Sequence, residues 1–202
     1  MTCATCRQLF EAADKRPDTR VREVDFARAQ CACEREVVSA HSPGQVADSE
    51  ILIRILVAPQ NMAKGKVRPR ASSLADAEFR GLSIFREKYT SKVRIRKIAE
   101  DLVRRAKVAN GEKAGVFGVL RIECSIVRAS KIDLDIFRGY CVYDTALNDD
   151  PSHAEIFQRV SDGDESLWGD RRRLLFESIK NTFVSVEDFE GGLLRDLAPT
   201  VL

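Results

Sequence analysis

The chain has 202 residues, of which 44% are hydrophobic and 32% charged, a composition typical of a globular protein that buries about 70% of its unfolded surface. No window approaches the roughly 18 consecutive apolar residues of a membrane span, and the N-terminus has no basic stretch followed by an apolar one. These features exclude an integral membrane protein and predict a cytoplasmic protein with no membrane partner.

The net charge of +2 conceals an uneven distribution. Residues 64–107 hold fourteen Lys or Arg against five Asp or Glu, whereas residues 144–165 are strongly acidic. Such asymmetry indicates one face that attracts anions and another that is acidic. In the alternative interpretation the two segments neutralise each other in the fold, or the basic residues form a solvated surface.

The N-terminal section, residues 1–44, carries four cysteines in two short pairs. They are Cys3, Cys6, Cys31 and Cys33. Two chelating pairs of thiolates suit a tetrahedral, structural Zn²⁺, which would leave no coordination position for a substrate. Buried inert thiols and a redox-active pair are the alternatives. A helix is expected over residues 7–16, and a link at 39–44 separates this section from a main domain, residues 45–202.

The first element of the main domain is a strand over residues 50–59, which is apolar and β-branched almost throughout and ends at a Pro. Arg54 interrupts it. A guanidinium inside such a run needs a buried carboxylate or a ligand, because an unpaired buried charge costs several kcal/mol.

A long loop over residues 60–80 is expected next, then a short strand over 81–86 and an amphipathic helix over 92–107. The loop and the outer side of the helix carry the cations expected to contact phosphates. They are Lys64, Lys66, Arg68, Arg70, Arg94, Arg96 and Lys97.

Two strands, residues 115–128 and 136–143, are expected to form an antiparallel hairpin with Cys124 and Cys141 in the core. A helix beginning at Asp150 and Pro151 would place His153 in its first turn, as a candidate acid or base or as a packed helix-end residue.

The last predicted helix covers residues 170–182 and begins with three arginines, an unfavourable place for cations. Preceding acids or an external anion must compensate them. The candidate acids are Asp162, Asp164 and Glu165.

Arg54 in a strand, followed by Tyr89-Thr90-Ser91 leading into a helix that contains Glu100, is distantly similar to the RES-type toxins. These toxins resemble ADP-ribosyltransferases and degrade NAD through an Arg, a Ser and a Glu. The resemblance implies an NAD-consuming enzyme with Arg54, Ser91 and Glu100 in one pocket.

Together these patterns predict an α+β protein with a mostly antiparallel sheet, covered by the helices over 92–107 and 170–182, and a small zinc-containing N-terminal section. The function favoured by the sequence is non-enzymatic binding of nucleic acid through residues 64–107. The alternatives are the NAD-consuming enzyme and a module that binds a protein partner through its acidic segment, residues 144–165.

Overall fold

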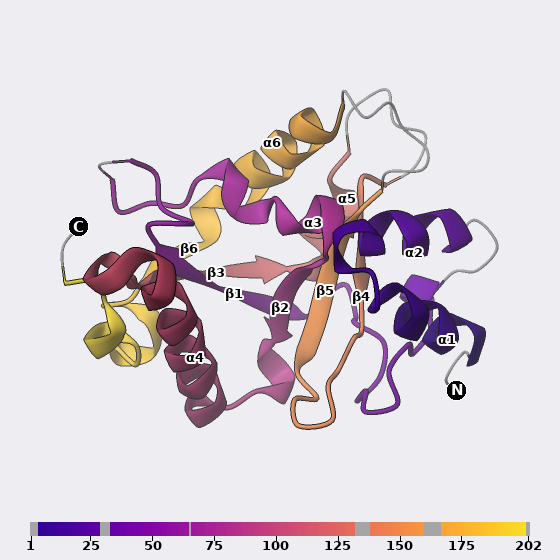
Figure 1. Ribbon diagram of the computed structural model, residues 1–202, viewed down its shortest axis with the longest axis horizontal. Coiled ribbons are helices and arrows are strands. Elements are labelled where there is room, and N and C mark those ends of the chain that lie inside the picture. Colours follow the sequence, from indigo (N-terminus) through magenta and orange to yellow (C-terminus); the bar gives the residue numbers. More distant parts are fainter. Residues whose placement is uncertain (1–3, 29–32, 65, 132–137, 160–166, 201–202) are drawn as a thin grey trace.

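The computed structural model describes residues 4–28, 33–64, 66–131, 138–159 and 167–200. Its architecture is α+β, with an antiparallel sheet at the centre and helices on both sides (Figure 1). The strands are β1 Ile51–Ala58, β2 Leu82–Arg86, β3 Gly115–Glu123, β4 Tyr140–Tyr143, β5 His153–Gln158 and β6 Phe183–Ser185. The helices are α1 Ala4–Ala13, α2 Arg20–Arg28, α3 Asp76–Phe79, α4 Lys92–Asn110, α5 Cys124–Ala129 and α6 Trp168–Ile179.

The six strands of the described residues follow the order β4-β5-β2-β1-β3-β6, and every neighbouring pair is antiparallel. The central pair, β1 with β3, is the longest, and it registers Arg54 against Leu120. Both strands are almost wholly buried, because helices cover the two faces of the sheet at this point.

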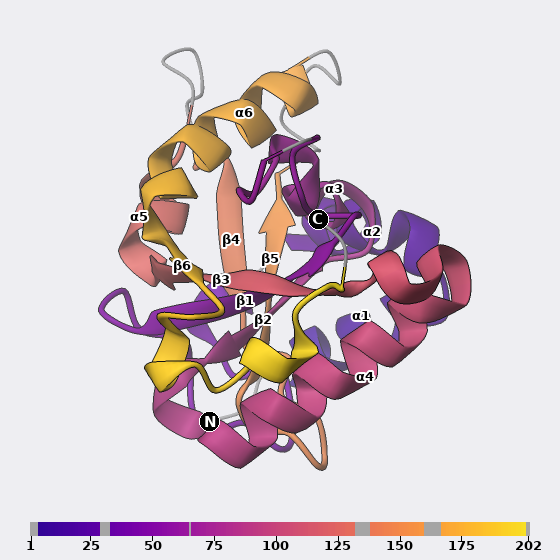
Figure 2. The ribbon, with the colours of Figure 1, turned by 90° about the vertical axis from the view of Figure 1, so that its left-hand side faces the viewer.

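The two faces of the sheet are covered by different helices, as Figure 2 shows with α6 on one side and α4 on the other. On the first face, Leu175 and Ile179 of α6 pack with α3 and α5 against alternate residues of the strands. On the second face, α4 and the C-terminal segment pack against β1 and β3 through Ile95, Ala99 and Val103. The helix over 92–107 is therefore confirmed, with Ser91 as its N-cap accepting from the Arg94 amide.

The N-terminal helices cover the other half of this second face. Phe10 of α1 and Val21 of α2 pack with Cys141, Tyr143 and Phe157 of β4 and β5. This contact joins residues on both sides of position 44 in one apolar cluster. None of the described helices is long and apolar enough to span a membrane.

The predicted hairpin between residues 115–128 and 136–143 is wrong. Strand β3 pairs with β1 and β6, whereas β4 pairs with β5. Residues 124–129 turn into helix α5, which packs Cys124 and Val127 into the core. The apolar run of 115–128 therefore contains a strand and a helix, which an apolar run alone does not distinguish. Cys124 and Cys141 are buried, as expected.

The helix expected to begin at Asp150 is also wrong. Asp150 accepts hydrogen bonds from the Ser152 amide and hydroxyl at 3.1 and 2.5 Å, which makes a turn, and strand β5 begins at His153. The side chain of Asp is equally suited to a turn and to a helix cap. Because successive side chains of a strand point to opposite faces of the sheet, Ala154 and Ile156 of β5 lie on the face covered by α6, and His153 lies on the opposite face.

The arginines at the start of α6 find acceptors both within α6 and in other parts of the chain. The proposed acids, residues 162–165, lie outside the described residues. The acceptors are the Arg159 carbonyl for Arg171, Glu78 for Arg172 and Asp170 for Arg173.

A buried charge cluster holds the start of the main domain in place. The Arg86 side chain is fully buried and donates to both oxygens of Glu50 at 2.7 Å and to the carbonyls of Gly44 and Gln45. Asp144, also buried, lies 3.5 Å from the same guanidinium. Burial raises the pKa of Asp144 to about 7, and the charge of Arg86 only partly offsets this.

Asp144 should make stability depend on pH. Its pKa is about 7 in the folded state and about 4 in an unfolded chain, so between these values the folded state binds the additional proton. Wild-type stability should therefore fall as pH rises through this window. An Asp144→Asn variant should gain on the order of 2–3 kcal/mol relative to wild type between about pH 5 and pH 7. Urea unfolding at several pH values measures this, and a difference independent of pH contradicts it.

Candidate functional site

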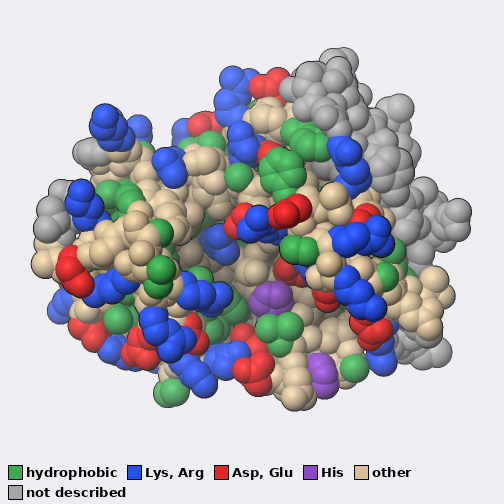
Figure 3. Space-filling model, viewed as in Figure 1, with side chains coloured by type: hydrophobic (Ala, Val, Ile, Leu, Met, Phe, Trp, Pro, Cys, Tyr) green, Lys and Arg blue, Asp and Glu red, His purple; other side chains and the backbone are tan. Residues whose placement is uncertain are grey.

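A cleft opens on the second face of the sheet, between α4 and the N-terminal helices. One cavity of about 580 Å³ lies between α4 and strands β1 and β2. A second, of about 390 Å³, lies beside α1. Leu147 and His153 line both cavities, so the two are lobes of one cleft. Figure 3 shows the hollow, with acidic and basic side chains around a histidine.

Arg54 lies where the sheet splits. The ladder between β1 and β2 ends after Ile53 and Phe85, and the two strands diverge beyond this point (Figure 1). The Arg54 Nη1 donates to the freed carbonyl of Ser83 at 2.9 Å, and its Nη2 lies 3.8 Å from Asp76. The expected carboxylate partner thus exists, but it is distant and its side chain is 57% exposed.

The guanidinium of Arg54 is incompletely satisfied. Its Nε is buried and has no hydrogen-bond partner among the described residues. Burial lowers the pKa of Arg54, and the negative charge of Asp76 offsets this only in part. An anion that entered the larger lobe would supply the missing negative charge beside the terminal nitrogens of Arg54.

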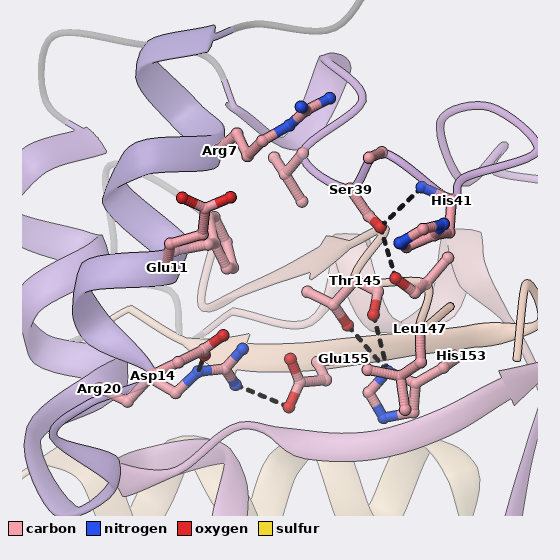
Figure 4. A pocket seen from close by; sticks show the side chains of 14 residues that line it. Arg7, Glu11, Asp14, Arg20, Ser39, His41, Thr145, Leu147, His153 and Glu155 are labelled. Atoms are coloured by element: carbon pink, nitrogen blue, oxygen red, sulfur yellow. Dashed lines mark hydrogen bonds and ion pairs between the residues drawn. The ribbon is translucent and has the colours of Figure 1, made fainter. Parts of the chain in front are cut away.

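His153 lies at the junction of the two lobes, held by a single ring nitrogen. Its Nδ1 lies 3.0 Å from the Thr145 carbonyl and 3.1 Å from the Thr145 hydroxyl (Figure 4). A carbonyl oxygen only accepts, so Nδ1 carries the proton in the neutral ring, and Nε2 is left as an acceptor. The ring packs edge-on against Phe85, with centroids 6.1 Å apart.

Glu155 follows on the same side of β5, and one of its oxygens accepts from Arg20 at 2.7 Å (Figure 4). The other oxygen, Oε2, is buried without a hydrogen-bond partner among the described residues. Arg20 also donates to Asp14, so helices α1 and α2 orient this carboxylate. Gly81 permits the approach, because a Cβ there would lie 2.8 Å from Arg20 and 2.9 Å from Glu155.

The structure brings together only part of the predicted catalytic set. Arg54 and His153 both line the larger lobe. Ser91 instead caps α4, where its hydroxyl accepts from the Arg94 amide. Glu100 is exposed and forms an ion pair with Arg96. Neither lines the two lobes of the cleft.

Two residues of the cleft were not found from the sequence. Ser83 of β2 lies directly opposite Glu155 of β5 in the sheet register, so their side chains share a face. The alternating pattern of His153, Ala154, Glu155 and Ile156 was the available signal. The helix-start signal of the preceding residues, Asp150 and Pro151, led instead to the prediction of a helix over this pattern.

The basic and acidic segments partly neutralise each other. Arg94 lies 3.0 Å from Asp150 and 3.5 Å from Asp149, and Arg86 lies beside Asp144. Arg96 of the basic segment pairs with Asp196 and Glu100. Of the acidic segment, residues 160–165 lie outside the described residues.

The predicted zinc ligands are largely outside the part of the chain that the structure describes. This holds for Cys3, Cys31 and the side chain of Cys33. Cys6 is buried in the apolar cluster of the N-terminal helices. The described residues contain no group of three or more His, Cys, Asp or Glu arranged to hold a metal. Zinc binding remains a prediction.

Metal analysis tests this prediction directly. Protein purified without chelator should contain about one zinc per chain, and a Cys3→Ser, Cys31→Ser double variant should lose it. Cys124 is an internal reference, because burial raises the pKa of its thiol to about 12 and suppresses its reactivity. Substoichiometric zinc, together with free reaction of Cys3 and Cys31 with thiol reagents, would overturn the zinc site.

The fold and cleft define an α+β protein with a split antiparallel sheet and a polar cleft at the split. No protein-family model, curated protein or solved structure matches the chain.

Proposed function

We propose that this cleft is the active site of an NAD-consuming enzyme, with residues other than those that the sequence suggested. The observation that carries the proposal is the buried Nε of Arg54, which has no partner among the described residues, in a cleft shared with His153. Clefts of this size hold small-molecule ligands, and an under-satisfied guanidinium favours a phosphate-bearing one.

The larger lobe would bind the pyrophosphate. Arg54 would donate to its oxygens as a fork through its terminal nitrogens, which neutralises the negative charge. Arg94 is a second donor on the α4 wall of this lobe, and its Nε is likewise buried without a partner among described residues. The rings of Phe85 and His153 provide an apolar surface for a heteroaromatic group at the junction of the lobes.

Glu155 and His153 would then perform the reaction. The bond between C1′ of the ribose and the nicotinamide nitrogen breaks, and its electron pair leaves with nicotinamide. The Glu155 carboxylate stabilises the positive charge that develops on the ribose. A water oxygen bonds to C1′ while Nε2 of His153 accepts the proton. The products are ADP-ribose, nicotinamide and a proton.

This assignment retains the residue types that the resemblance to RES-type toxins implies. Arg54, Ser83 and Glu155 belong to the neighbouring strands β1, β2 and β5. The Ser83 carbonyl accepts from Arg54, and Ser83 is the register partner of Glu155. Ser83 and Glu155 therefore take the places that Ser91 and Glu100 have in the sequence-based hypothesis.

Incubation with NAD and chromatographic detection of free nicotinamide tests the proposal. Release in proportion to protein concentration is expected, together with protection of the protein against thermal unfolding by ADP-ribose. The absence of both nicotinamide release and ADP-ribose binding would reject the proposal. Binding without release would retain the nucleotide site but reject the reaction.

A further inference from the structure

The first half of the predicted loop over residues 60–80 forms a hairpin, referred to below as the basic hairpin, residues 61–64 and 66–70. Met62 and Pro69 form an antiparallel bridge. The Ala63 amide donates to the Arg68 carbonyl at 2.9 Å, and the Arg70 amide donates to Asn61 at 3.0 Å. These bonds hold the cations of the hairpin on a defined backbone.

A groove of about 470 Å³ separates the basic hairpin from the C-terminal end of α6. Its principal side chains are Arg68, Arg70, Phe176, Lys180, Asn181 and Phe183. Phe176 and Phe183 are half-buried and pack against the core, and Phe183 also contacts Phe117 with ring centroids 5.9 Å apart. The groove thus combines partly buried aromatic rings, an exposed amide and cations, together with the Glu177 carboxylate, which pairs with Lys180.

The cations of the basic hairpin differ from Arg94 and Arg96 of α4 in having no acidic partner among the described residues. Lys64, Lys66 and Arg68 are exposed, and none of them forms an ion pair with a described residue. Arg94 and Arg96 of α4, by contrast, pair with acids. Figure 3 shows Lys and Arg side chains over this corner of the molecule. The hairpin therefore presents three exposed cations that no described acid neutralises.

We propose that the basic hairpin and this groove bind single-stranded nucleic acid. A base would stack on Phe176, with its edge hydrogen-bonded to Asn181, while Lys64, Lys66 and Arg68 contact phosphates. A single strand is favoured over a duplex because a paired base cannot enter a groove, whereas an unpaired base can turn outward and stack. The groove shares no lining residue with the two lobes of the cleft at Arg54, and its proposed role does not depend on the NAD reaction.

Fluorescence anisotropy with labelled oligo(dT) and oligo(U), at about 50 and 200 mM salt, tests this site. A triple variant with Lys64, Lys66 and Arg68 changed to Gln should bind roughly tenfold or more weakly at the lower salt. The slope of log affinity against log salt should become shallower by about 2, since each phosphate contact contributes about 0.7 for a single strand.

The control triple variant changes Lys97, Arg104 and Lys113 to Gln, which removes the same charge at positions that do not line the groove. It should retain nearly wild-type binding. Phe176→Leu should weaken binding about fivefold or more with an unchanged salt slope, because stacking is lost and phosphate contacts remain. Equal losses in the two triple variants, no effect of Phe176→Leu, or tighter binding to duplex than to single strand would each overturn the proposal.

Discussion

A Glu155→Gln variant is expected to release nicotinamide from NAD about 10²–10³-fold more slowly than the wild-type protein. The substitution removes the negative charge that stabilises the developing ribose cation, and the loss of one preorganised electrostatic group has this order of effect on the rate. The amide retains an oxygen that can accept from Arg20, and Asp14 remains beside the guanidinium. The effect should appear mainly in kcat, because the charge acts in the transition state.

The matched control is Glu100→Gln, which makes the same chemical change on the exposed side of α4, where Glu100 pairs only with Arg96 among the described residues. It should leave the rate unchanged. If Glu155→Gln does not fold, Arg54→Lys tests the same site, because loss of the fork should raise KM more than it lowers kcat. A rate that falls in Glu100→Gln and not in Glu155→Gln would restore the sequence-based assignment.

An Arg86→Met variant should lose about 3–5 kcal/mol of unfolding free energy, the usual cost of removing one partner from a buried charge cluster. Arg86 is fully buried, and its guanidinium satisfies Glu50 and the carbonyls of Gly44 and Gln45. Methionine fills much of the volume but leaves the Glu50 carboxylate without its cation. Urea unfolding monitored by circular dichroism measures the loss.

Arg121→Met is the matched control for this measurement. Arg121 makes a similar two-bond contact with Glu87, at 2.7 and 2.9 Å, but both side chains are partly exposed to solvent. The expected loss is within about 1 kcal/mol. Comparable losses in the two variants would show that burial of the Arg86 cluster contributes little.

Most helices and strands whose apolar residues recur with a clear helical or strand period could be predicted from the sequence. Strand β1 lies within the predicted residues 50–59, β2 within 81–86, and α4 begins at Lys92 as expected. Their signals are local, namely a β-branched run closed by Pro and an apolar stripe after a capping Ser. These local signals gave wrong predictions at residues 124–129 and 150–158. In the first segment an apolar run suits either a strand or a helix, and in the second an Asp suits either a turn or a helix cap.

Arg54 could be found from the sequence because a charge inside an apolar strand has to be explained by a partner or a ligand. The serine and the glutamate of the proposed site could not be found in this way. Ser83 and Glu155 are 72 residues apart in the chain and meet only because β2 pairs with β5. Sequence spacing instead indicated Ser91 and Glu100. Ser91 caps helix α4 and Glu100 belongs to it, but neither residue lines the cleft.

The sequence by itself determined the α+β class, the central strand β1 and the packed face of α4, because hydrophobic periodicity and capping depend on neighbouring residues. Only the tertiary structure decided the strand order, the split between β1 and β2, and which cations are paired. Those features depend on non-local pairing: Arg94 is compensated by Asp150, and Arg86 by Glu50. This pairing, and not the local sequence, distinguishes the cations of the basic hairpin and the unsatisfied Arg54 from Arg86, Arg94 and Arg96.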